Sequence, residues 1–107
     1  MQANNRPTNS AVAGPDLLRR MVGPDPHRPG PARGRLLAES VPVWAIVGYV
    51  GAIAGSTEPD AITDDVIAEV AEAYDVSHEA VQAALLYYDE HRCAIDALQD
   101  ANAAALT

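Results

Sequence analysis

The 107-residue sequence has a single cysteine, no lysine and no long apolar run. Cys93 cannot form a disulfide within the chain, and one thiol with three scattered histidines gives no spacing typical of a metal site. The longest apolar run, Val41 to Ala54, is interrupted by two glycines and is too short to cross a bilayer. Residues 1–22 lack the apolar segment of a signal peptide. We therefore expect a cytoplasmic protein that has no contact with membranes and holds no metal or cofactor.

Charge is divided unevenly along the chain, whose formal net charge is −8. Residues 1–38 carry six arginines against two acids, a net charge of +4, whereas the remainder carries Arg92 against thirteen acids, a net charge of −12. A basic arm thus precedes an acidic body. Such an arm suits contact with an acidic partner such as DNA, although an arm folded onto the acidic body would show the same pattern.

The basic arm, residues 1–34, is rich in Pro, Gly, Asn and Arg. Proline donates no backbone hydrogen bond and biases the residue before it to extended angles, so the arm is predicted to be disordered when alone. A marginal helix over Pro15 to Val22 is the one element we expect in it. Residues 35–107 are then predicted to form the folded domain, which begins with a short extended segment at Arg35 to Leu37.

Most of the helix-periodic apolar residues lie between Thr63 and Leu98. A first helix follows Thr63, an N-cap residue, and ends near Tyr74; a second, longer helix begins after Ser77 and runs to the C-terminal end. Only about three residues join them, which predicts a helix-turn-helix. Val41-Pro42-Val43 is either a second short strand or, as we favour, the lead-in to a helix with Pro42 in its first turn. The apolar residues from Val43 to Val50 predict that this helix is buried, with Trp44 as a core anchor rather than a ligand platform. The expected fold is therefore an all-α, small helix-turn-helix bundle with a disordered arm.

Two blocks of the sequence, Val41 to Val50 and Tyr74 to Asp96, resemble a bacterial helix-turn-helix family. This is the domain of unknown function four-three-three family, whose members are often described as VapB-type antitoxins. The first block is similar to the family's hydrophobic-Pro-Val-Trp start, and the second to its signature around the turn and second helix. The matching residues of the second block are Tyr74, Val76, Ser77, Glu79, Ala80, Val81, Ala83, Ala84, Leu85, Tyr87, Tyr88, Asp89, Glu90 and His91.

The resemblance implies an antitoxin of a toxin-antitoxin system. Such a protein binds a small cognate toxin, often a PIN-domain ribonuclease, and regulates transcription by binding DNA at its own promoter. The chain departs from the family in carrying Ala38-Glu39-Ser40 where a Gly-Thr-Arg is common, so a cation is lost there.

If the second helix reads DNA, its exposed early positions are His78, Glu79, Gln82, Ala83 and Leu86. Gln82 could pair with an adenine edge and His78 with a phosphate, whereas Glu79 would face a strongly negative surface. Phosphate contacts could come from the arm, through arginines of a flexible segment. The DNA-binding candidates are thus Arg28, Arg33, Arg35, His78 and Gln82. A helix that packs on a protein, and an arm that is only a solvated linker, are equal alternatives.

A three-four spacing joins Val81, Ala84, Tyr88, His91, Ile95 and Leu98. Such a stripe could be the seam of a homodimer or the core of the chain itself. Tyr87 and Tyr88 are adjacent and about 100° apart on a helix, so one of them must leave the core. The partner-binding candidates are Tyr87, Tyr88, His91, Ile95 and Leu98.

An enzyme is not expected, because Cys93 and His91 point to different sides of a helix and there is no Gly-rich phosphate loop or carboxylate pair. Two functions follow as hypotheses. The first is an antitoxin-like protein that binds its promoter and a toxin. The alternative is a protein-interaction adaptor that has the same fold and does not bind DNA.

Overall fold

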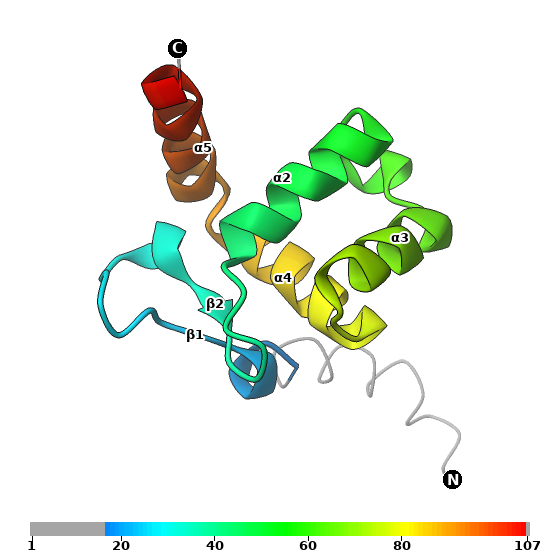
Figure 1. The fold of residues 1–107 in the computed structure, drawn as a ribbon, viewed down its shortest axis with the longest axis horizontal. Coiled ribbons are helices and arrows are strands. Elements are labelled where there is room, and N and C mark those ends of the chain that lie inside the picture. The colour runs from blue at the N-terminus through cyan, green and yellow to red at the C-terminus, as the bar shows by residue number, and fades with distance from the viewer. Residues whose placement is uncertain (1–16, 107) are drawn as a thin grey trace, which may run out of the picture.

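The computed structural model describes residues 17–106, and helices make up most of them. Residues 17–21 are helical, and the later elements are β1 (Val22–Gly23), η1 (Pro31–Arg33), β2 (Arg35–Leu36), α2 (Val43–Ala54), η2 (Pro59–Ala61), α3 (Asp64–Tyr74), α4 (His78–Glu90) and α5 (Arg92–Leu106) (Figure 1). The predicted all-α bundle is confirmed. The predicted disorder of residues 1–16 and the start of the helix expected from Pro15 lie outside the described residues.

The helix-turn-helix is formed by α3 and α4. The Thr63 hydroxyl accepts a hydrogen bond from the Val66 amide at 3.3 Å, and the Ser77 hydroxyl accepts one from the Ala80 amide at 3.0 Å, so both expected N-caps are present. Asp75 ends α3 in the left-handed region, at φ 56° and ψ 48°. This residue turns the chain, and the Val76 amide then donates back to the Ala71 carbonyl at 2.9 Å.

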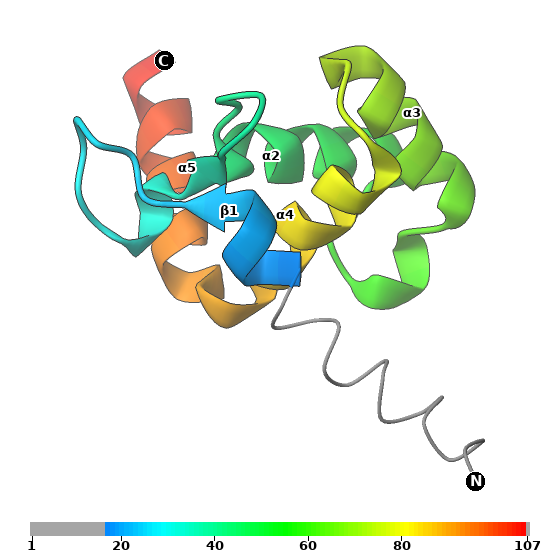
Figure 2. The same cartoon turned by 90° about the horizontal axis from the view of Figure 1, so that it is seen from below.

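The core lies where α2 packs across α3 and α4, an arrangement visible from two sides in Figures 1 and 2. Val43, Ile46, Val47 and Val50 of α2 are at most 2% exposed, as the near-continuous apolar character of this helix predicts. Pro42 stands at the N-cap of α2, where its missing amide proton leaves no helical bond unmade. The Tyr74 hydroxyl donates to the Ala45 carbonyl at 3.2 Å and ties the end of α3 to α2.

The second helix of the unit is shorter than the sequence predicts, because it ends at Glu90 and a separate helix, α5, starts at Arg92. His91 leaves helical geometry at φ −128° and ψ 34°, and its amide is shared between the Tyr87 and Tyr88 carbonyls at 3.1 Å. The break turns α5 toward α2 and η1, both of which it contacts. A continuous helix would leave Ile95, which is fully buried here, without these neighbours.

The later part of the predicted arm, from Val22 on, packs against the folded domain in the structure. β1 pairs antiparallel with β2, Val22 opposite Leu36, and the Leu37 amide donates to the Met21 carbonyl at 2.8 Å. Leu36 is fully buried and Val22 is 9% exposed. Partners later in the chain thus supply the hydrogen bonds and apolar contacts that this proline-rich segment cannot supply to itself. The structure therefore places residues 22–34 against the domain that begins at Arg35.

Candidate functional site

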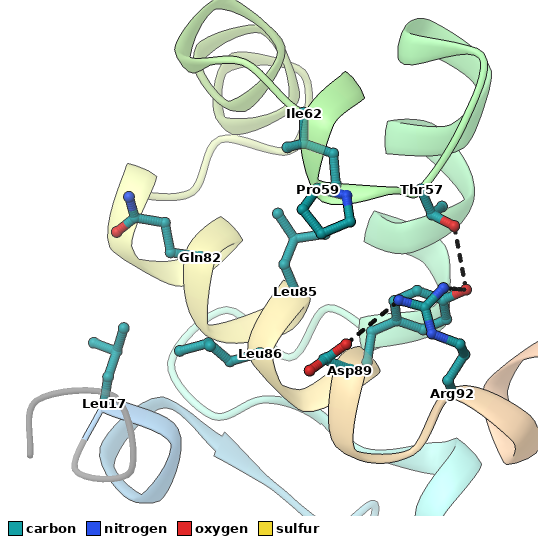
Figure 3. Close-up of a pocket in the computed structure, with 10 residues that line it drawn as sticks. Leu17, Thr57, Pro59, Ile62, Gln82, Leu85, Leu86, Asp89 and Arg92 are labelled. Atoms are coloured by element: carbon teal, nitrogen blue, oxygen red, sulfur yellow. Dashed lines mark hydrogen bonds and ion pairs between the residues drawn. The ribbon is translucent and has the colours of Figure 1, made fainter. Parts of the chain in front are cut away.

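An open groove of about 500 Å³ runs along the outer side of α4, between the helical segment at Leu17 and the loop that contains η2. Its lining comes from four separate parts of the chain and is mostly apolar. The residues are Leu17, Thr57, Pro59, Ile62, Gln82, Leu85, Leu86, Tyr88, Asp89 and Arg92 (Figure 3).

The floor of the groove is built from leucines of α4. Leu85 points toward Pro59 and Ile62, and Leu86 extends toward Leu17 (Figure 3). Leu86 is 39% exposed, one of only two large apolar side chains that stand out to solvent among the described residues. Consecutive residues on a helix point about 100° apart, so the Leu85-Leu86 pair spreads apolar surface from the edge of the core out to water. Apolar surface gathered in a hollow is typical of a binding site.

The other end of the groove is polar and centres on Tyr88. Its hydroxyl lies 3.3 Å from the Thr57 hydroxyl, donates to Oδ1 of Asp96 at 2.8 Å and accepts from Nη1 of Arg92 at 3.4 Å. The Arg92 guanidinium also lies over the Tyr88 ring, 4.7 Å from its centroid. These contacts join the η2 loop, α4 and α5 and fix this end of the groove.

Burial raises the pKa of Tyr88 above its ordinary 10.0, and the hydrogen bond to Asp96 acts in the same direction, whereas the bond to Thr57 lowers it. The phenol therefore stays protonated at neutral pH and donates a hydrogen bond to Asp96. A general base needs a pKa close to the working pH. Tyr88 is thus a structural donor that orients the wall of the groove.

Two exposed carboxylates, those of Asp89 and Glu58, stand beside Arg92 at the polar end of the groove. Arg92 forms ion pairs with Asp89, at 3.4 Å between Nη2 and Oδ1, and with Glu58, at 3.8 Å between Nη1 and Oε2. The Asp89 and Glu58 side chains remain 73% and 72% exposed. Glu90 and Glu79 are also exposed on α4. An apolar floor that ends at two exposed carboxylates favours an apolar ligand that also carries a basic group.

The residues expected to bind DNA fall on different parts of the molecule. His78 and Gln82 are exposed near the start of α4, and Gln82 lines the groove. Arg28 and Arg33 instead line a second hollow, together with Trp44 of α2. Arg35 lies on β2, half-buried. The structure therefore does not bring the arginines and the two α4 residues to one surface.

Ala83 was expected among the exposed positions of α4, and it is fully buried. Ala83 is buried because the β1–β2 sheet contacts α4, as do α2 and α3. The outer face of α4 is narrower than the sequence predicts and centres on Gln82 and Leu86.

Two of the expected partner-binding residues belong to the core of the chain: Ile95 is fully buried and Tyr88 is 3% exposed. Tyr87 is half-buried and donates from its hydroxyl to the Pro31 carbonyl at 2.7 Å, and the His91 ring lies 4.4 Å from the Tyr87 ring. Leu98 is half-buried on α5. Because the helix breaks at His91, these residues do not form the continuous helical stripe from which a homodimer was predicted.

The groove residues Leu17, Pro59 and Ile62 were not anticipated as site residues. They come from the arm and from a loop, which carry no helical periodicity to reveal which side chains meet. In the sequence only Leu86 indicated the groove, because it is a large apolar residue that lies off the apolar stripe of α4.

Within residues 17–106, no three His, Cys, Asp or Glu side chains gather closely enough to hold a metal ion. None of the helices in this range is long and apolar enough to span a membrane. Comparison of the chain with family models, with curated proteins and with solved structures finds no match.

Proposed function

We propose that this chain is an antitoxin-like helix-turn-helix protein whose groove beside α4 binds a small toxin protein. One observation supports the binding of a protein most directly. Leu85 and Leu86 form an apolar floor on the outer side of α4, and this floor is open to solvent and ends at the exposed carboxylates of Asp89 and Glu58. The antitoxin assignment itself rests on the resemblance of Val41 to Val50 and Tyr74 to Asp96 to that family.

The occupant we propose for the groove is an amphipathic helix of the toxin, with leucine-like side chains on one face and arginine or lysine beside them. Apolar side chains entering the groove would remove Leu86 and Ile62 from water, which is the main source of affinity in such contacts. Basic residues at the edges would meet Asp89 and Glu58, which are largely exposed. A second copy of this chain would bring the same two carboxylates against the first pair, which favours a basic toxin helix over self-association through the groove.

The test is the binding of the neighbouring gene's product, measured by titration calorimetry with the full chain. Leu86→Ser is expected to weaken binding by at least about tenfold, because a buried leucine contributes about 1.5–3 kcal/mol and 1.4 kcal/mol corresponds to tenfold. Leu37→Ser is the matched control, because Leu37 is the other large exposed apolar residue, 50% exposed, and does not line the groove.

Equal binding by wild type and Leu86→Ser would reject the groove as the docking surface. If the neighbouring product does not bind at all, the antitoxin proposal fails, and the adaptor alternative would be pursued with amphipathic basic helices as ligands. Asp89→Asn should weaken binding more at low salt than at high salt, since a rim charge acts mainly through long-range attraction.

DNA binding is the second candidate, favoured by the capped, exposed start of α4 next to the turn. It predicts a sequence-specific mobility shift on the chain's own upstream DNA that weakens from low to moderate salt. Gln82→Ala should abolish the sequence preference while leaving the fold intact, because the Gln82 side chain is exposed. A shift that is equal on unrelated DNA, or absent with and without the toxin, would reject this candidate.

A further inference from the structure

We propose that a second hollow, formed by the end of the arm and the helices α2 and α5, binds a small molecule that joins a phosphate to an aromatic ring, such as a nucleoside monophosphate. Arg28, Arg33, Trp44, Asn102 and Ala105 line this hollow, which measures about 420 Å³. Small-molecule sites span about 300–1,000 Å³. None of these residues lines the groove beside α4, so this proposal is independent of the proposed protein docking.

Positive charge is concentrated at this hollow in a chain that is otherwise acidic. Within the part of the chain that the structure describes, no carboxylate forms an ion pair or hydrogen bond with the guanidinium of Arg28 or Arg33. The first turn of α2, which includes Trp44, holds no acidic residue and has no side-chain cap, so its dipole adds to the positive field. Two guanidiniums beside a helix start favour a phosphate, because each can donate two parallel hydrogen bonds to its oxygens.

The walls of the hollow are held in place by long-range hydrogen bonds. The Tyr87 hydroxyl donates to the Pro31 carbonyl at 2.7 Å and fixes η1, which carries Arg33. Nε2 of Gln99 donates to the Trp44 carbonyl at 2.8 Å and joins α5 to α2. A site whose walls are already ordered loses little entropy when a ligand binds.

The remaining lining suits an uncharged ring. The Trp44 indole is only partly buried, and Ala105 adds apolar surface. The Asn102 amide can both donate and accept a hydrogen bond, as recognition of the edge of a nucleobase requires. The arginines thus suit the phosphate of a nucleoside monophosphate, and tryptophan and asparagine suit its base.

The charge of the rest of the chain favours a small ligand over a nucleic acid. Residues 39–107 hold thirteen acids against one arginine, so a long polyanion would leave the hollow and meet repulsive surface. A single phosphate would need only the short-range contacts that Arg28 and Arg33 supply.

Trp44 is the only tryptophan of the chain, so its fluorescence reports on this hollow alone. Titration of the full chain with adenosine monophosphate is expected to give a saturable change in that fluorescence. Adenosine alone and inorganic phosphate alone should each bind at least about tenfold more weakly, because each supplies only half of the contacts.

The variant pair Arg28→Gln and Arg33→Gln should weaken binding by at least about tenfold, since charge-assisted hydrogen bonds are lost. The matched control pair Arg19→Gln and Arg20→Gln removes the same charge outside the hollow and should bind as wild type does. Asn102→Ala keeps both guanidiniums and should weaken the nucleotide more than inorganic phosphate. Unfolding curves of each variant verify that the fold is retained.

The proposal is overturned if the fluorescence change of the wild type does not saturate with adenosine monophosphate. It is also overturned if the variant with both Arg28→Gln and Arg33→Gln binds the nucleotide as tightly as the wild type does. A single-stranded oligonucleotide that binds more than about tenfold tighter than the mononucleotide, with a steep salt dependence, would also overturn it in favour of nucleic-acid binding.

Discussion

The hydroxyl of Tyr88 donates a hydrogen bond of 2.8 Å to Oδ1 of Asp96, across the break between α4 and α5. Tyr88 is 3% exposed, so its ring belongs to the core while its oxygen holds the next helix. The angle between α4 and α5, and with it the polar end of the groove, depends on this contact.

Tyr88→Phe is expected to lower the free energy of unfolding by about 1–2 kcal/mol. The variant lacks the hydroxyl that forms hydrogen bonds with Thr57, Asp96 and Arg92. Urea denaturation gives the value. Tyr49→Phe is the control: the Tyr49 ring packs edge-on against Tyr74, with 5.7 Å between centroids, and no hydrogen bond from its hydroxyl is found among the described residues. A loss no larger than that of the control would show that the Tyr88 hydroxyl does not hold α5.

Stability is expected to fall in alkali. Burial raises the pKa of both Tyr87 and Tyr88 above the ordinary 10.0, so the folded chain holds these protons more tightly than the unfolded chain does. Their contribution to the free energy of unfolding is therefore complete below about pH 10 and is lost as the pH rises through the folded-state pKa values. Urea midpoints between pH 8 and 11.5, roughly the span around that value, measure the loss. It should be smaller in Tyr88→Phe, and an identical loss in both proteins would contradict the assignment.

Substitution by alanine is expected to have opposite effects on stability at two glycines, Gly34 and Gly51. A Cβ on Gly34 would lie 2.5 Å from Cζ of Tyr87, so Gly34→Ala must displace that ring and should destabilise the fold by about 1–3 kcal/mol. A Cβ on Gly51, inside α2, would meet only Cγ2 of Thr57 at 3.5 Å, an ordinary contact. Gly51→Ala should therefore stabilise by about 0.5–1 kcal/mol through helix propensity. Thermal unfolding compares the two: a midpoint that does not fall in Gly34→Ala would contradict the packing at Gly34, and one that falls in Gly51→Ala would contradict the ordinary contact at Gly51.

Ser77→Ala is expected to cost about 1 kcal/mol, because the first turn of α4 loses the oxygen that accepts from the Ala80 amide. Ser77→Asp should restore most of the stability, since a carboxylate can cap the helix and complements its dipole. Chemical denaturation of both variants is the measurement. An aspartate variant as unstable as the alanine variant would show that the hydroxyl acts in some way other than capping.

The helix-turn-helix could be predicted from the sequence because its signals are local. Thr63 and Ser77 are strong N-cap residues, and the apolar residues between and after them repeat at helical spacing. Short-range physics fixes the start of both helices and the end of the first, and at the turn between them the structure adds the left-handed geometry of Asp75.

The break at His91 and the groove could not be predicted in the same way. No glycine or proline marks the break, which follows from the contacts of α5 with α2 and η1 and from the burial of Ile95. Likewise, Leu17 and Ile62 come together in the groove only through the tertiary fold. The position of residues 22–34 depends on β2, on Tyr87 and on α5, all of which come later in the chain.

The hydrogen bond from Tyr87 to Pro31 joins positions 56 residues apart, and the one from Gln99 to Trp44 joins positions 55 residues apart. During synthesis, η1 and the start of α2 therefore leave the ribosome roughly 3–11 s before these partners are made, at about 5–20 residues per second. Until those partners are made, this segment has no hydrogen-bond partners and lies close in sequence to the apolar residues Leu36 and Val43. It is therefore exposed to incorrect strand pairing. The prolines and glycines of residues 23–34 make it a poor template for such pairing, so its composition protects the nascent chain until α4 and α5 arrive.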